Sequence, residues 1–333
     1  MKKYLIVIIL LAIQAVVLGQ DTRRLMNLRG HWKFSIGDRP EWSKTNYDDS
    51  DWEEIYVPER WEREGFNGYD GFAWYRTKFS GKGLNKDRYH LISLGYIDDV
   101  DEVFINGVKI GFSGGFEPFY YTAWNAERVY MIPPEVLNYN GDNQIAVRVY
   151  DQGGEGGIYS GSVGILYLDD YSAKEQVFLQ GVWKIKIDDD PDFAKVAYDD
   201  SNWQNVMVPS NWKTIGIFDL NDFAWYRKTF TLQPGTSTTD MTLIGGKIDD
   251  FDEIYINGVK IGETNDGKWL GSSRSFSELR VYNIPNGLLK PGKNVIAVRV
   301  EDIGDNGGIY EGPVVIMPTS EATRYARKSS WWR

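Results

Sequence analysis

The chain has 333 residues, a formal net charge of −10, 15% aromatic residues, 35 glycines and no cysteine. The lack of cysteine excludes disulfides, a catalytic thiol and a thiolate zinc site, and the acidic balance makes nucleic acid and anionic lipid poor ligands. Aromatic residues favour strands and glycine favours turns, so the composition indicates an all-β protein long enough for two domains.

Residues 1–19 have the composition of a secretory signal peptide. Lys2 and Lys3 precede an almost wholly apolar run over residues 4–18, and small residues stand before Gln20. An uncleaved membrane anchor is the alternative, but the run is short for a hydrocarbon core about 30 Å thick. We therefore expect cleavage after residue 19, a secreted or periplasmic mature chain, and no membrane attachment of that chain.

From residue 28 onward, a series of motifs occurs twice in the same order. The offset is 151 residues; Ile97, for example, recurs as Ile248. The repeated segments are 28–36 and 179–187, 47–52 and 198–203, 72–76 and 223–227, 97–111 and 248–262, 145–149 and 296–300, and 156–159 and 307–310. A period of this size is the length of a domain, so the pattern predicts a tandem duplication. We predict one unit over 20–169, a second over 170–318 and a frayed polar tail over 319–333.

The longest repeated segment predicts a β-hairpin. Val103 and Ile105 alternate with residues of the opposite face, as in a half-buried strand. Asn106-Gly107 follows directly, and both central positions of a type I′ turn need a positive φ, which Asn and Gly tolerate best. The second copy predicts the same turn at Asn257-Gly258.

The remaining pattern indicates strands rather than helices. Each copy contains about eight strand candidates separated by Gly, Pro and Asn or Asp turns, and no long run with a period of 3.6 residues is apparent. Strands of this number and spacing predict two tandem jelly-roll β-sandwiches.

Catalytic motifs are absent from the sequence. The two histidines, His31 and His90, lie in strand patterns and neither recurs in the second copy. There is no Gly-x-Ser-x-Gly elbow and no triad-like spacing of His and Asp. The Gly-rich stretch 153–157 carries an acid where a phosphate would lie. We expect both histidines to be structural.

Two acidic clusters leave three interpretations open. They are Asp98, Asp99, Asp101 and Glu102 in the first copy, and Asp249, Asp250, Asp252 and Glu253 in the second. In the favoured interpretation, these acids are structural: they cap loops and pair with Arg76 or Arg148 in the first copy, and with Arg227 or Arg299 in the second. A glycosidase-type carboxylate pair is less favoured, because it needs a substrate cleft. The third is structural Ca²⁺, for which the loops 151–157 and 302–308 have a suitable composition.

Aromatic residues divide into two groups. Six tryptophans recur at fixed places in strand patterns and are predicted to lie in the core: Trp32, Trp52, Trp74, Trp183, Trp203 and Trp225. The segment that follows the first hairpin is not periodic and carries further aromatics, so it is either a ligand platform or a loop folded over the sheet edge. Aromatic rings can cover a sugar face while acids and amides bind its hydroxyls. The predicted carbohydrate-binding residues are Phe116, Glu117, Tyr120, Tyr121, Trp124 and Asn125, with Asp266 and Trp269 in the second copy.

The ordered motifs resemble a known family. Phe-Ala-Trp-Tyr-Arg, Ile-Asp-Asp-x-Asp-Glu, Asn-Gly-Val-Lys-Ile-Gly and Gly-Gly-Ile-Tyr are similar to the sugar-binding jelly-roll domain of family 2 glycoside hydrolases. The second copy resembles the version inserted in bacterial sialate O-acetylesterases. The resemblance implies a galactose-binding-like fold. The catalytic residues of both families lie on other domains, and the Arg that usually follows Gly-Gly-Ile-Tyr is replaced here by Ser160 and Glu311.

These observations predict a secreted, non-catalytic protein that binds carbohydrate or assists a glycan-degrading enzyme. A hydrolase that uses the acidic clusters and a scaffold without a ligand are the two alternatives.

Overall fold

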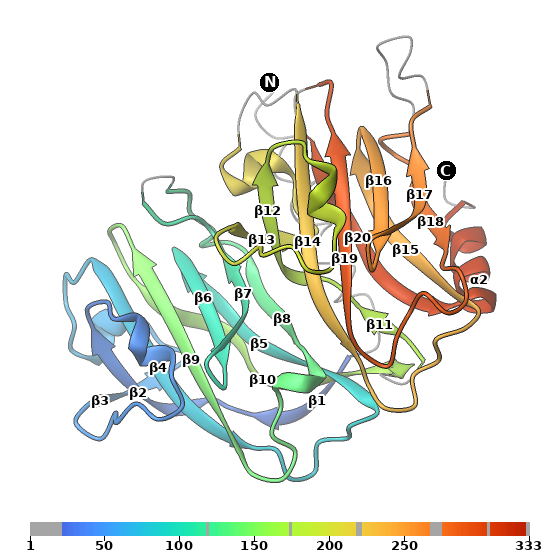
Figure 1. The fold of residues 1–333 in the computed structure, drawn as a ribbon. Coiled ribbons are helices and arrows are strands. Elements are labelled where there is room, and N and C mark those ends of the chain that lie inside the picture. Colours follow the sequence, from blue (N-terminus) through green and yellow to red (C-terminus); the bar gives the residue numbers. More distant parts are fainter. Residues whose placement is uncertain are drawn as a thin grey trace. The chain divides into compact units, whose positions relative to one another are not determined.

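The computed structural model describes residues 22–117, 120–172, 175–217, 222–266, 275–304 and 307–330. The predicted signal peptide lies outside these residues. The internal contacts divide the chain into a first unit that ends at Tyr171 and a second that begins at Ser172, and each unit is described by itself (Figure 1). Within the described residues, no helix is both long and apolar enough to cross a membrane.

Both units are built almost wholly from strands, so the all-β prediction is confirmed. The first unit contains β1 (Thr22–Asn27), β2 (Gly30–Ile36), β3 (Glu53–Val57), β4 (Gly71–Ser80), β5 (Arg88–Asp98), β6 (Val100–Ile105), β7 (Val108–Ser113), β8 (Glu127–Ile132), β9 (Asp142–Asp151) and β10 (Gly157–Ser172). The second contains β11 (Val177–Phe178), β12 (Gly181–Ile187), β13 (Gln204–Val208), β14 (Phe223–Leu232), β15 (Met241–Asp249), β16 (Phe251–Ile256), β17 (Val259–Thr264), β18 (Leu279–Asn283), β19 (Gly292–Glu301) and β20 (Gly308–Pro318). Short 3-10 helices join some of them: η1 (Pro40–Ser43), η2 (Trp61–Glu64), η3 (Pro134–Val136), η4 (Pro191–Ala194) and η5 (Trp212–Ile215).

Each unit has one four-stranded and one six-stranded sheet. The strand orders are β1-β10-β5-β8 and β3-β2-β4-β9-β6-β7 in the first unit. In the second they are β11-β20-β15-β18 and β13-β12-β14-β19-β16-β17, which is the same topology with every strand number raised by ten. The repeated sequence therefore gives a repeated fold.

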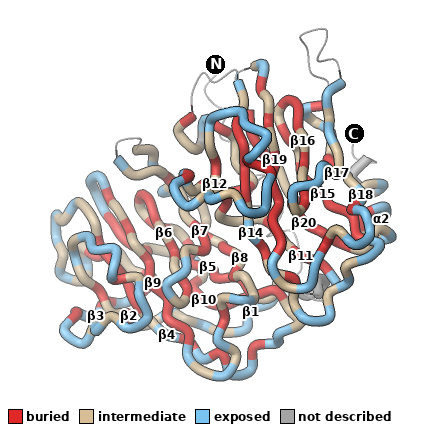
Figure 2. Tube along the Cα trace, viewed as in Figure 1, coloured by how far each residue is buried: buried red, intermediate tan, exposed pale blue. Residues whose placement is uncertain are grey.

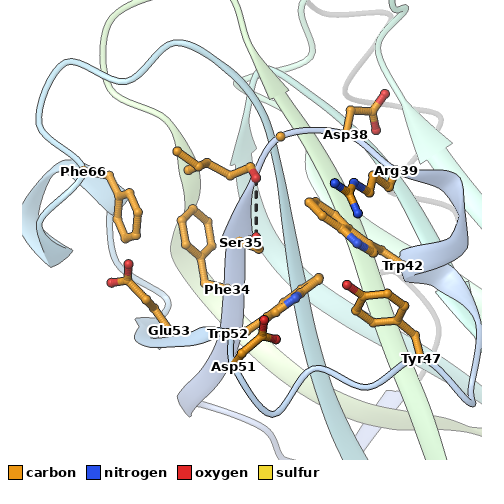
Figure 3. A pocket seen from close by; sticks show the side chains of 12 residues that line it. Phe34, Ser35, Asp38, Arg39, Trp42, Tyr47, Asp51, Trp52, Glu53 and Phe66 are labelled. Carbon is orange, nitrogen blue, oxygen red and sulfur yellow. Dashed lines mark hydrogen bonds between the residues drawn. The ribbon is translucent and has the colours of Figure 1, made fainter.

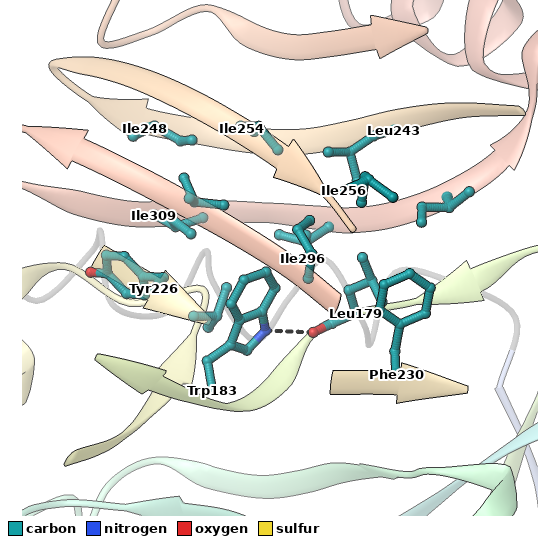
Figure 4. Close-up of a cluster of buried hydrophobic side chains, with 14 of the residues drawn as sticks. Leu179, Trp183, Tyr226, Phe230, Leu243, Ile248, Ile254, Ile256, Ile296 and Ile309 are labelled. Atoms are coloured by element: carbon teal, nitrogen blue, oxygen red, sulfur yellow. Dashed lines mark hydrogen bonds between the residues drawn. The ribbon is translucent and has the colours of Figure 1, made fainter. Parts of the chain in front are cut away.

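The two sheets of the second unit share one hydrophobic core. Trp183, Tyr226 and Ile256 come from the six-stranded sheet, while Leu243 and Ile309 come from the four-stranded sheet, and all lie in one cluster (Figure 4). The indole Nε1 of Trp183 donates to the carbonyl oxygen of Leu179 at 2.6 Å, so the buried polar atom of this ring is satisfied. Figure 2 shows that buried positions gather in the strands and exposed ones in the loops.

A second aromatic cluster covers part of each six-stranded sheet. In the first unit it contains Trp42, Trp52 and Trp74, and in the second Phe193, Trp203 and Trp225 take their places. The six tryptophans predicted to be core are at most 8% exposed, so that prediction is confirmed.

Both predicted hairpins are present. Asn106 and Gly107 have φ values of 51° and 81°, and Asn257 and Gly258 have 48° and 83°, as a type I′ turn requires. The asparagine side chain also closes the turn region: Asn106 Nδ2 donates to Val136 O and Asn143 Oδ1, both at 2.8 Å. Tolerance of positive φ and a fully bonded amide explain why asparagine stands here.

The prediction of a frayed tail without helix is wrong for residues 319–330. They form the helix α2 (Thr319–Ser330), in which Ala322 is 1% exposed and packs with Ile244, Val315 and Met317. Packing of one apolar stripe on β15 and β20 stabilises the helix, although its other faces are polar.

Candidate functional site

Three aspartates converge at one end of the first unit. Asp98 ends β5, Asp99 precedes β6, and Asp151 ends β9. Strands β6 and β9 pair with Val100 opposite Tyr150, which brings the two chain segments together. One carboxylate oxygen from each aspartate lies within 4.8 Å of the others.

The closeness of the three carboxylates shifts their pKa values. Burial, together with a hydrogen bond and charge repulsion from Asp99, raises the pKa of Asp98 to about 7. Burial and the charge of Asp99 raise the pKa of Asp151 to about 6. Burial opposes ionisation of Asp99 as well, but hydrogen bonds from the Thr122 and Tyr120 hydroxyls hold its pKa below the ordinary value. Close carboxylates cannot all ionise freely without a compensating charge.

The second unit repeats the arrangement. Asp249, Asp250 and Asp302 offer three oxygens within 4.8 Å of one another. Burial and Asp250 raise the pKa of Asp249 to about 7, and burial raises the pKa of Asp302 to about 6. The sequence suggested the loops 151–157 and 302–308 as calcium ligands. The first residue of each loop, Asp151 or Asp302, belongs to one of these clusters.

A buried arginine fixes the loop that follows each hairpin. Arg128 Nε donates to Asp101 Oδ1 at 2.6 Å, both side chains are 0% exposed, and the Tyr130 hydroxyl donates to Asp101 Oδ2 at 2.7 Å. A second guanidinium nitrogen donates to Asp99 O at 3.0 Å, and another donates to Ala123 O. The loop is thus tied to the end of β5 by one side chain.

Arg280 repeats this role with Asp252 and Tyr282. Both arginines escape a search for repeats at a constant offset, because Arg128 and Arg280 are 152 residues apart and the other motifs are 151 residues apart. The signal was Arg-Val-Tyr-x-Ile-Pro, which occurs at 128–133 and 280–285.

The predicted pairing of each acidic cluster with one of two arginines is confirmed. Arg148 lies 3.1 Å from Glu102, and Arg299 lies 3.3 Å from Glu253. Arg76 and Arg227, the other arginine of each alternative, bind Asp49 at 2.6 Å and Asp200 at 2.8 Å instead.

Part of the predicted sugar-binding loop packs on its own unit. The Phe116 ring stacks on Phe72 at 5.8 Å, and the Arg148 guanidinium lies 4.3 Å from the centroid of Phe116. Tyr120 contacts the ring of Tyr150 at 5.9 Å, and Tyr121 forms backbone hydrogen bonds with Gly115. These three predicted ligand residues are only partly exposed.

The other predicted residues of the first unit are exposed to solvent. Trp124 is 51% exposed, and Glu117 and Asn125 are also exposed. The backbone oxygen of Trp124 accepts from the Tyr159 hydroxyl at 3.2 Å, which links the loop to the Gly-Gly-Ile-Tyr motif. The side chain of Trp124 is therefore presented to solvent by a backbone that is held in place.

In the second unit, Phe276 lies at the matching position. It is 48% exposed, and its backbone oxygen accepts from the Tyr310 hydroxyl at 2.6 Å. Asp266 is exposed, while the predicted ligand Trp269 lies outside the described residues. The role of the predicted loop residues in binding stays a prediction.

A cavity of about 520 Å³ lies at the end of β2 in the first unit (Figure 3). Its lining residues are Phe34, Ser35, Ile36, Gly37, Asp38, Arg39, Trp42, Tyr47, Asp51, Trp52, Glu53 and Phe66. Arg39 lies over the Trp42 ring at 5.9 Å from its centroid. Aromatic rings beside carboxylates and a guanidinium suit a polar ligand with an apolar face, and sequence reasoning did not single out this site.

Both histidines lie in strands, as the sequence predicted. His90 is 1% exposed within β5, and burial lowers its pKa to about 4. His31 is on β2 and packs edge-on against Tyr56, with ring centroids 5.6 Å apart. The interpretation of both as structural residues agrees with these positions.

The chain matches a known family twice. The family model of the β-galactosidase second all-β domain matches residues 37–155 and residues 198–306, together more than half of the chain. A β-galactosidase of Photobacterium profundum is 30% identical over 138 residues, which are 37% of this chain and 13% of that protein. The β-galactosidase BoGH2A of Bacteroides ovatus is 27% identical over 139 residues, covering 38% and 15%.

A Formosa agariphila protein named as a β-glucuronidase is 32% identical over 134 residues, which are 36% of this chain and 12% of that protein. The chain therefore spans less than a sixth of the length of these relatives. Among solved structures, a β-glucuronidase of Bacteroides uniformis is 16% identical, with a TM-score of 0.36, and the match covers 85% of this chain and 28% of that one. The similarity to the sialate O-acetylesterase version stays a prediction.

Proposed function

The chain belongs to the family of the β-galactosidase second all-β domain, and on this basis we propose that it is a secreted or periplasmic accessory protein that binds carbohydrate. In this proposal the two units are galactose-binding-like jelly rolls without a catalytic site of their own. The glycan-related names of the relatives support a glycan as the ligand class and a glycan-degrading enzyme as the partner.

The observation that carries the proposal is the exposed Trp124. A half-exposed tryptophan is unusual, since burial of so large an apolar ring stabilises a fold. Its loop is anchored through Arg128 and Tyr159, so little conformational freedom is lost when a ligand binds. Exposed Glu117 and Asn125 on the same loop supply acceptors and a donor for hydroxyl groups.

The cavity at the end of β2 is a second location for the same ligand class. Asp51 and Glu53 line it beside the ring of Trp52. In the second unit these two acids are replaced by Asn202 and Gln204. Both locations therefore favour the first unit over the second.

A glycan array followed by titration calorimetry tests the proposal on the mature full-length chain. We expect Trp124→Ala to weaken binding at least tenfold, while Phe276→Ala, its match in the second unit, leaves the affinity unchanged. Arg39→Ala reports on the cavity: loss of binding in this variant alone would move the ligand there. The absence of any glycan signal would remove the carbohydrate function.

Hydrolysis is measured in parallel on chromogenic glycosides and acetyl esters. Turnover by the pure protein that disappears with Asp98→Asn would favour the hydrolase alternative over an accessory role.

A further inference from the structure

The two aspartate clusters contain an unsatisfied buried atom at the same place. Asp151 is 1% exposed and Asp302 is 2% exposed, and among the described residues Oδ2 of each carboxylate has no hydrogen-bond partner of ordinary geometry. In each case the other oxygen accepts from a backbone N–H two residues later, from Gly153 or Gly304. A buried acceptor without a partner is costly, so its occurrence in both units calls for a ligand.

The nearest positive side chain does not serve this atom. The Arg128 guanidinium donates to the Asp101 carboxylate and to the backbone oxygens of Asp99 and Ala123. Arg280 is used in the same way, on Asp252 and on backbone oxygens. Within the part of the chain that the structure describes, three carboxylates in each unit are thus gathered without a cationic side chain hydrogen-bonded to their oxygens.

We propose that each unit binds one calcium ion between its three aspartates, Asp98, Asp99 and Asp151 in the first and Asp249, Asp250 and Asp302 in the second. Calcium takes oxygen ligands at 2.3–2.6 Å, so oxygens on opposite sides of the ion are about 4.8 Å apart, and three carboxylate oxygens that all lie within 4.8 Å of one another can reach the same ion. Magnesium requires shorter bonds and a near-ideal octahedron, and zinc prefers nitrogen or sulfur ligands. The raised pKa values of Asp98 and Asp151 agree with negative charge that lacks a counter-ion.

The two sites differ in their surroundings. Glu62 of η2 has a buried oxygen without a partner, and its charge acts on Asp151. The matching residue in the second unit is the exposed Lys213 of η5. Because a carboxylate attracts a cation and an ammonium repels it, the first unit binds calcium more tightly than the second.

The first site also holds the aromatic loop. The Thr122 hydroxyl donates to Asp99, and Ala123 N donates to Asp99 O at 3.0 Å. An ion on Asp99 therefore stiffens the segment that presents Trp124. The calcium proposal does not rest on the carbohydrate function, since metal binding is measured without any sugar.

The test is calorimetric titration of the EDTA-treated, full-length mature chain with CaCl₂. We expect two calcium ions per chain, and a single ion in each of Asp151→Asn and Asp302→Asn. Asp142→Asn, at the opposite end of β9, is the matched control and should keep both sites. Glu62→Lys gives the first unit the charge of the second and should weaken only the tighter site, by about tenfold.

Terbium luminescence provides an independent readout. Aromatic rings sensitise terbium in both sites: Tyr120 hydrogen-bonds Asp99 in the first, and Trp212 lies beside Asp302 in the second. Asp151→Asn and Asp302→Asn should therefore each remove part of the signal. If Asp151→Asn fails to fold, Glu62→Lys and the rise of the wild-type melting temperature on adding calcium still decide. The proposal would be overturned if no calcium bound at millimolar concentration, or if both aspartate variants still bound two ions. Protons shared between the carboxylates would then be what compensates their charge.

Discussion

The two units share most of the residues that hold the framework and differ at single positions in the core and on the surface. Both keep the Asn-Gly turn, the buried Arg–Asp–Tyr group, the aromatic cluster and the three aspartates. They differ at His90 and Met241 in the core, at Glu62 and Lys213 beside the aspartates, and at Trp124 and Phe276 on the loop. Both units thus keep the same scaffold, while the residues beside the aspartates and at the tip of the loop differ, which predicts unequal binding by the two units.

The largest expected effect tests the shared framework. Arg128→Met leaves Asp101 buried without its partner, and breaking a buried ion pair in this way costs about 3–5 kcal/mol. Arg280→Met should cost the same in the second unit. Differential scanning calorimetry of the full chain measures both losses. A much smaller loss in one unit would show that the same buried ion pair contributes differently to the stability of the two units.

How far the sequence could predict this framework depends on sequence separation. The Asn-Gly hairpins were predictable because the turn chemistry is contained in two adjacent residues. The partner of Asp101 is 27 residues away, beyond a loop whose length differs by one residue between the copies. A search at constant offset therefore aligns Arg128 with the wrong residue and misses the pair.

Helix α2 was missed for a related reason. Its sequence has a low apolar content, and only the 3- and 4-residue spacing of Ala322, Tyr325 and Ala326, with Glu321 near the start, indicates a helix. The candidate site was partly predictable: the acids and the loop stand out in the sequence. Which acids meet depends on the pairing of β6 with β9, which no local pattern specifies.

A smaller effect is expected at the turns. Asn106→Ala replaces asparagine with a residue that tolerates positive φ less well, and it removes the side-chain hydrogen bonds to Val136 and Asn143, for a loss of about 2–3 kcal/mol. Asn257→Ala should give an equal loss, measured by urea unfolding. Asn106→Gly and Asn257→Gly are the matched variants, since they keep the φ tolerance and lose only the hydrogen bonds.

The two cores should respond differently to acid. Burial depresses the pKa of His90 to about 4 from an unfolded value of about 6.5, so the unfolded state binds the extra proton between these values. This stability is complete above pH 6.5 and is lost as pH falls toward 4, by about 2 kcal/mol at pH 5. Hydrogen exchange over β5 measures it, and His90→Met, which copies Met241, should remove this loss between pH 7.5 and 5. The raised pKa values of Asp98 and Asp151 make stability increase as pH falls over the same range, and this contribution remains in the variant. An unchanged pH dependence in that variant would assign the acid sensitivity to other groups.

The smallest expected effect on stability is at the loop. Trp124→Ala removes a side chain that is 51% exposed. The free energy of unfolding of the first unit should therefore change by no more than about 0.5 kcal/mol. Phe276→Ala, with 48% exposure, should be equally mild. The two variants thus have matched structural costs, and any difference in glycan binding between them belongs to the ligand and not to the fold. A large loss of stability in Trp124→Ala would show instead that this ring packs on its unit, and the exposed-platform argument for carbohydrate binding would fail with it.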